Sequence, residues 1–270
     1  MINSILEIFS YSFMTRALIV GLLISLCSSL IGVSLVLRKN SMIGDGLSHV
    51  AFGAFAVASI MNLAPLEFTI PVVIIVSFFI LKINDSSKIH GDARIAMISA
   101  SSLAIGTFLI SLFGVNTDIN NYLFGSILSI NIKDVIISSI LSVIVILLYI
   151  ISYNKIFAIT FDEKFAKSIG IKTNFYNMLF ASLCSVVVVL GMRLMGSLLI
   201  SSLIIFPTIT SMQMFKRFKS VVISSVVISL ISFVIGLLVS YYNSTPAGAT
   251  IVLVHLFMFL IFKLVSYIKN

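Results

Sequence analysis

The sequence contains few charged residues: Asp, Glu, Lys and Arg together make up 10% of its 270 residues, while hydrophobic residues make up 60%. A soluble globular domain is about 25% charged and about 45–50% apolar. So few charges cannot cover a water-facing surface, which excludes the soluble classes and indicates an integral membrane protein in a lipid bilayer. The net charge of +8 is explained by the position of basic residues along the chain, so we expect no nucleic-acid partner.

Three other features of the composition limit the structures and functions that this chain can have. No Trp is present, so the aromatic residues at the membrane interface must be Tyr. The two cysteines, Cys27 and Cys184, lie in apolar runs without metal-ligand spacing, and we expect them to pack as small hydrophobic residues. No phosphate-binding loop of the Gly-x-x-x-x-Gly-Lys-Ser/Thr type occurs. We therefore expect this chain not to be an enzyme, and ATP would have to bind another subunit.

Apolar runs recur along the chain with short polar breaks between them. A helix that crosses the bilayer core needs about 20 residues, so the runs predict an all-α, polytopic transmembrane helix bundle with eight or nine spans, forming one domain over residues 1–270. The second and third runs contain Gly53 and Pro71, so either run could be broken or tilted. Only Arg193 separates the sixth and seventh runs, which predicts a very tight hairpin. The runs cover residues 13–37, 46–61, 66–83, 93–115, 134–153, 175–192, 194–212, 220–241 and 248–267.

The basic residues are unevenly distributed. With nine spans and a cytoplasmic C-terminus, 14 of the 17 Lys and Arg residues lie on the cytoplasmic side, and only Arg16, Lys133 and Arg193 lie outside. Cytoplasmic loops of membrane proteins carry an excess of Lys and Arg, so this distribution predicts a cytoplasmic C-terminus. The N-terminus is then outside if nine spans hold; alternatively, the first residues lie flat on the cytoplasmic surface and a later run is a half-span.

An acid and a histidine, Asp45 and His49, stand four residues apart at the start of the second run. This spacing places both side chains on one face of a helix. Ionisable groups in a membrane span are costly and usually functional, and carboxylate oxygen and imidazole nitrogen suit manganese, zinc and ferrous iron. The alternative is that Asp45 caps the helix and His49 packs in the core. His255 lies in the middle of a run, where packing in the core is favoured over a ligand role.

The longest polar break covers residues 154–172, and it has the pattern of a short amphipathic helix. Asp162 and Glu163 provide acid at the start of a helix, and Gly170 is suited to end one. Phe161, Phe165 and Ile169 recur at steps of four and form one apolar stripe. The helix is either a connector that lies on the cytoplasmic surface or a docking element for a cytoplasmic partner.

Five blocks, in order along the chain, carry a resemblance to a known family. They are Arg38-Lys39-Asn40-Ser41-Met42-Ile43-Gly44-Asp45-Gly46-Leu47-Ser48-His49, then residues 121–125, 162–170, 194–207 and 244–249. Together they resemble the membrane permeases of metal-type ABC importers, the zinc, manganese and iron group. The sequence departs from the family's usual pattern at Phe52-Gly53-Ala54 and at Phe206-Pro207-Thr208. Neither departure changes an ionisable position, so they bear on packing.

The resemblance implies a multi-pass subunit of the bacterial cytoplasmic membrane that forms the translocation pathway for Mn, Zn or Fe and holds no permanent cofactor. It implies a homodimer, cytoplasmic ATP-binding subunits and an extracytoplasmic metal-binding protein as partners. Asp45 and His49 match the positions that contact the passing ion in the family. The alternative from another class is a carrier or channel driven by an ion gradient, which would need acids or arginines deep in the spans. The positions that match the family's ATPase-docking loop are Asp162, Glu163, Phe165, Ala166 and Gly170.

Overall fold

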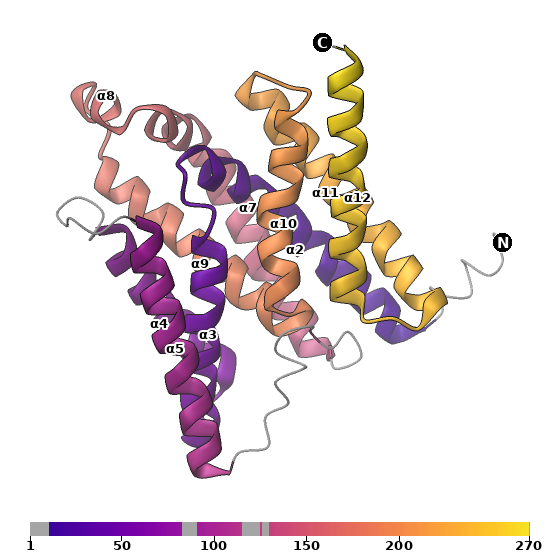
Figure 1. Cartoon of the computed structure of the whole chain (residues 1–270). Coiled ribbons are helices and arrows are strands. Elements are labelled where there is room, and N and C mark those ends of the chain that lie inside the picture. Colours follow the sequence, from indigo (N-terminus) through magenta and orange to yellow (C-terminus); the bar gives the residue numbers. More distant parts are fainter. Residues whose placement is uncertain (1–10, 83–90, 115–124, 126–129, 270) are drawn as a thin grey trace.

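The protein is described here from a computed structural model, which covers residues 11–82, 91–114, 125 and 130–269. His90 and Asp118, whose roles the sequence left open, lie outside the described residues. All regular structure in the described part of the chain is helical (Figure 1). Its helices are α2 (Ser12–Leu37), α3 (Ile43–Ile60), α4 (Pro65–Lys82), α5 (Gly91–Phe113), α7 (Ile132–Phe161), α8 (Glu163–Ser168), α9 (Thr173–Met195), α10 (Ser197–Met212), α11 (Phe218–Asn243) and α12 (Ala247–Lys269).

Each of the nine predicted apolar runs corresponds to one helix, which confirms the all-α membrane bundle. Seven helices are long and apolar enough to cross a membrane, and α4 and α10 are shorter apolar helices. Of the two possibilities predicted for the second and third runs, a break does not occur, because α3 and α4 are each continuous and α4 runs through Pro71. The short amphipathic helix of residues 154–172 is also present, as α8.

The core of the bundle is built around α2. This helix packs against α7, α9, α10 and α11. In its most apolar stretch, 72% of the residues are buried. The corresponding figures are only 17% for α5 and 11% for α12, which stand on opposite sides of the bundle in Figure 1. The apolar outer faces of α5 and α12 are therefore available to lipid or to another subunit.

The bundle has one strongly basic end. At this end the ring of Phe161 on α7 lies 5.9 Å from that of Phe218 on α11, and Ser266 on α12 donates a hydrogen bond to the carbonyl of Gln213 after α10. The end of α2 lies at the same end of the bundle, because Arg38, directly after α2, donates a hydrogen bond to Thr160 on α7. The charge asymmetry predicted from the sequence therefore corresponds to one end of the folded molecule. The basic residues gathered there include Arg38, Lys39, Lys155, Lys164, Lys167, Lys172, Lys216, Arg217, Lys219 and Lys263.

At the opposite end, polar groups join α2, α7 and α9. Arg193 on α9 forms an ion pair of 3.2 Å with the buried carboxylate of Asp134 on α7. Asp134 and Asn131 also form a reciprocal capping box at the start of α7, and Arg16 donates to the carbonyl of Ile130 at 3.4 Å. These contacts satisfy backbone and charged groups that would otherwise be costly next to lipid.

The connection between the sixth and seventh runs lies at a different residue from the one predicted. Arg193 lies inside α9, and the break falls at Gly196, whose φ of 88° is readily adopted only by glycine. The very tight connection is confirmed, because this single residue separates α9 from α10. Placing the break at Arg193 was wrong, since its ion pair with Asp134 allows a cation to remain in the last turn of an apolar helix.

The fifth run also extends further than predicted. The polar break was expected to begin at Asn154, but α7 continues to Phe161 and has 30 residues. The rings of Tyr153 and Phe157 lie 5.6 and 5.0 Å from the ring of Phe218. This aromatic packing stabilises the turns of α7 that extend beyond the predicted apolar run. At 1.5 Å per residue α7 is about 45 Å long, compared with about 30 Å for a hydrocarbon core. It therefore holds α8 away from the membrane core.

The departure from the family pattern at residues 52–54 has a packing role. A side chain at Gly53 would place its Cβ 2.8 Å from the carbonyl oxygen of Ser102, and one at Gly106 would meet the ring of buried Phe52 at 2.9 Å. Small residues of this kind let membrane helices approach closely. Gly53 and Gly106 therefore allow α3 and α5 to pack backbone against backbone.

The ion pair between Asp134 and Arg193 generates a stability prediction. We expect Asp134→Ala to lower the free energy of unfolding by about 2 kcal/mol, because it removes the acceptor of the Asn131 N–H in the capping box and leaves a half-buried cation unpaired. Thermal unfolding of the purified protein in detergent measures the effect. Lys133→Ala, which changes the exposed neighbouring side chain, is the matched control, and equal melting temperatures for the two variants would contradict the prediction.

Candidate functional site

Asp45 and His49 lie together on the first two turns of α3. Nε2 of His49 is 3.6 Å from Oδ2 of Asp45, so the predicted placement of both side chains on one helix face is confirmed. The Asp45 side chain is 47% exposed and that of His49 is 20% exposed. The two groups thus reach the molecular surface from a helix whose neighbouring residues are mostly buried.

A third polar group, which the sequence did not predict, comes from α10. The hydroxyl of Ser201 donates to Oδ1 of Asp45 at 3.3 Å, and it also lies 3.2 Å from the carbonyl oxygen of Ser197 in its own helix. A serine hydroxyl has one proton to donate, so it serves one of these acceptors at a time. Ser201 is 156 residues from Asp45 in sequence, and no local spacing signals such a contact.

The depth of the site follows from its contact with α10. Ser201 is 11 residues before Met212, the last residue of α10 at the basic end of the bundle, which corresponds to about 16 Å along the helix. Gly44 and Gly46, on either side of Asp45, face Ile204 on α10 and Ile95 on α5. Asp45 therefore lies part-way along the length of the bundle, although it is in the first turn of its own helix and keeps one side at the molecular surface.

The capping alternative for Asp45 is wrong. Helix α3 begins at Ile43 after Met42, and no side chain caps its first turn. Asp45 uses its oxygens for His49 and Ser201 instead.

His255 lies apart from this pair, in the core. Its side chain is buried at 1% exposure and its ring stacks on Phe206 of α10 with centroids 6.4 Å apart. This placement agrees with the packing role favoured from the sequence.

One chain supplies only a sparse set of metal ligands at this site. Within the described ranges, no group of three or more His, Cys, Asp and Glu side chains is close enough together to hold a metal ion. A structural zinc site is normally closed by four protein ligands. The geometry of Asp45, His49 and Ser201 therefore suits transient contact with an ion, completed by water or by a second subunit.

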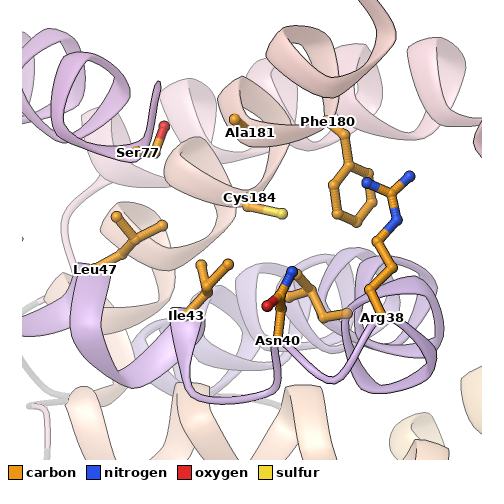
Figure 2. Close-up of a pocket in the computed structure, with 9 residues that line it drawn as sticks. Arg38, Asn40, Ile43, Leu47, Ser77, Phe180, Ala181 and Cys184 are labelled. Atoms are coloured by element: carbon orange, nitrogen blue, oxygen red, sulfur yellow. The ribbon is translucent and has the colours of Figure 1, made fainter. Parts of the chain in front are cut away.

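A small pocket lies on the other side of α3. It is lined by Arg38 and Asn40 of the α2–α3 connection, by Ile43 of α3 and by apolar residues of α9, including Cys184 (Figure 2). Asp45 follows Ile43 by two residues, which turns it about 200° away on a helix. Cys184 and Cys27 are both buried free thiols, as predicted, so the pocket contains packing residues and one half-buried cation.

Helix α8 begins and ends at the residues that the sequence indicated. Asp162 is its N-cap and accepts a hydrogen bond of 2.9 Å from the backbone N–H of Phe165. The chain turns away at Gly170, which has φ of 83°. The Ala166 side chain is fully buried against the rest of the bundle, while Phe165 and Ile169 are each more than half exposed. The small helix therefore has one anchored face and one free apolar face.

A bundle of apolar helices with an ionisable pair inside it and an exposed amphipathic helix at its basic end is characteristic of a multi-pass membrane transport protein. The chain belongs to the ABC 3 transport family, whose model matches residues 10–266. This assignment sets aside the carrier or channel driven by an ion gradient, because the family is one of ABC transporters.

Named relatives and a solved structure agree with the assignment. The chain is 30% identical to the manganese import system permease protein ScaB of Streptococcus gordonii, over 93% of this chain and 90% of ScaB. It is 28% identical to the high-affinity zinc uptake system membrane protein ZnuB of Haemophilus influenzae, over 91% and 94% of the two chains. The fold matches PsaBC from Streptococcus pneumoniae with a TM-score of 0.88 and 29% identity over the full length of both chains.

The cap of α8 generates a prediction about local stability. We expect Asp162→Ala to weaken α8 by about 1 kcal/mol, because the N–H of Phe165 loses its partner. Amide hydrogen exchange within residues 163–169 then rises about fivefold, which mass spectrometry of the purified protein measures. Asp162→Asn, which keeps a capping oxygen, should exchange like the natural protein, and unchanged exchange in the alanine variant would contradict the prediction.

Proposed function

We propose that this chain is the permease subunit of an ATP-driven importer for a divalent transition metal ion, manganese, zinc or iron, in a bacterial cytoplasmic membrane. The whole chain acts as a single permease domain. The observation that carries the proposal is the group of Asp45, His49 and Ser201, held inside a bundle of the ABC 3 transport family. The ion is the substrate, and no permanently bound cofactor is required.

The chemistry of the site suits passage of a divalent transition metal. Carboxylate oxygen and imidazole nitrogen are ligands for manganese, zinc and ferrous iron. The contacts of Asp45 in the described structure, 3.6 Å to His49 and 3.3 Å to Ser201, are long for charge-assisted hydrogen bonds. An incoming cation displaces such contacts at little cost, and few protein ligands allow it to leave again.

The exposure of Asp45 supports a homodimer. A half-exposed carboxylate within a membrane helix is strongly disfavoured against lipid. A second copy of the chain facing this surface encloses a polar path and doubles the number of available ligands. The ion then passes between two sets of Asp45 and His49.

The basic end of the bundle is the cytoplasmic end in this proposal, following the positive-inside rule. ATP-binding subunits dock there on α8, whose exposed Phe165 and Ile169 supply the apolar contact. An extracytoplasmic metal-binding protein delivers the ion at the opposite end. With nine membrane-crossing helices, the C-terminus lies in the cytoplasm and α2 begins outside.

The metal-pathway proposal predicts loss of transport on truncation of either ligand. We expect Asp45→Ala and His49→Ala each to lower uptake of radioactive manganese, zinc or iron more than about tenfold, because each removes a direct ligand of the ion. Uptake is measured in cells that lack other importers for the same metal, with the membrane level of each variant determined in parallel.

Glu67→Ala is the matched control for this experiment. Glu67 is also an acid in the first turn of an apolar helix, α4, but it is exposed and follows the far end of α3. We expect this variant to transport normally. Full uptake by both the Asp45 and the His49 variants at normal protein level would remove the site from the proposal.

The docking proposal predicts that a charge on α8 weakens binding of the ATP-binding subunit. We expect Phe165→Asp to reduce affinity about thirtyfold, corresponding to roughly 2 kcal/mol, because it places a carboxylate in an apolar contact. Co-purification followed by titration of the two subunits in detergent measures the change. Lys164→Ala on the same helix is the control, and unchanged co-purification of the Phe165 variant would rule out α8 as the docking element.

A further inference from the structure

A half-buried arginine connects three parts of the chain at the basic end. Nη1 of Arg38, directly after α2, donates to Oδ1 of Asn177 on α9 at 3.0 Å. Its Nε donates to the hydroxyl of Thr160 at the end of α7 at 3.3 Å. Its guanidinium lies 5.0 Å from the centre of the Phe180 ring, an arrangement visible in Figure 2. The side chain is therefore fixed from several sides.

Asn177 passes this contact on to α8. Its Nδ2 donates to Oε1 of Glu163, the first residue of α8, at 2.7 Å. A guanidinium can only donate and a carboxylate can only accept, so the charges of Arg38 and Glu163 dictate which way the amide of Asn177 points. Arg38, Asn177 and Glu163 thus form a chain of two charge-assisted hydrogen bonds.

Arg38, at the other end of these two hydrogen bonds, is close in sequence to the proposed metal site. After Arg38, the backbone N–H groups of Lys39 and Asn40 donate back to the carbonyls of Val36 and Leu35 in α2, at 3.0 and 2.9 Å. Ile43, the first residue of α3, donates to the carbonyl of Asn40 at 3.1 Å. Lys39 holds a left-handed conformation with φ of 58°. So short and tightly bonded a connection leaves little room for the start of α3 to move independently of the end of α2. Asp45 follows Arg38 by only seven residues.

We propose that Arg38, Asn177 and Glu163 form a relay that couples the position of α8 to the position of Asp45, with Asn177 as its central positioning residue. The inference rests on the proposed function, because it gives α8 and Asp45 the roles assigned above. Displacement of α8 by its docked partner pulls on Glu163, and the relay transfers the displacement through Arg38 to the start of α3. The metal site then changes its contact with Ser201.

The test separates coupling from docking and from the metal site. The permease variant is purified with its ATP-binding subunit and reconstituted in liposomes with the metal-binding protein, and metal uptake is measured per ATP hydrolysed. We expect Asn177→Leu, which keeps the side-chain volume and removes both hydrogen bonds, to lower this ratio about tenfold while co-purification is retained, since a hydrogen bond to a charged group is worth about that factor.

Asn174→Leu is the matched control, because Asn174 is an exposed asparagine one turn earlier on α9. We expect this variant to keep the natural ratio. A ratio for Asn177→Leu equal to that of the control would overturn the relay. Loss of co-purification in Asn177→Leu would also overturn it, since the residue would then act in docking.

A second pair of variants protects the test against simple misfolding. Asn177→Asp keeps an acceptor for Arg38 but sets a carboxylate against Glu163, so we expect uncoupling. Adding Glu163→Gln supplies an amide N–H opposite the new carboxylate and should restore most of the ratio. Absence of restoration contradicts the relay. If the natural chain itself transports none of the three metals, the proposed function fails instead.

Discussion

An ionised side chain in an apolar bundle is stable only if protein groups or enclosed water replace its hydration, and two acids in this chain meet that constraint differently. Asp134 stands in the first turn of α7, is buried, pairs with Arg193 at 3.2 Å and completes a capping box. Asp45 stands in the first turn of α3, is half exposed, caps nothing and makes longer contacts. The first acid has a complete structural role. The second retains capacity to bind another cation.

The placement of Asp45 depends on helix packing far from it in sequence. The glycines on either side of Asp45 let α3 approach α5 and α10, and Gly53 continues the close contact with α5 further along α3. On the other side, the single-residue break at Gly196 starts α10 early enough for Ser201 to reach the carboxylate. The polar site is therefore a product of close backbone packing, which explains why its neighbours are small residues.

Local features of this molecule could be predicted from the sequence, and contacts between distant segments could not. The spacing of Asp45 and His49, the limits of α8 and the basic end all follow from residues near one another in the chain. Ser201 carries no such signal, since Asp45 is 156 residues away, and neither does the contact of Asn177 with Arg38, which is 139 residues away. The true end of α7 was missed for the same reason, because Phe218 on α11 stabilises its last turns. Periodicity reports which face of a helix is apolar, but it does not report what that face meets.

The free energy that the relay can transmit is limited by its weaker bond, because its two hydrogen bonds act in series. A hydrogen bond to a charged group contributes about 1.5–3 kcal/mol, and the bond to Glu163 is exposed, where solvent weakens it further. Moving a two-state equilibrium from 1:99 to 99:1 takes about 5.5 kcal/mol of differential interaction, so the relay biases the position of Asp45 and does not switch it alone. A tenfold bias requires only about 1.4 kcal/mol. The docked partner must therefore supply the rest of the free energy through other contacts with the permease.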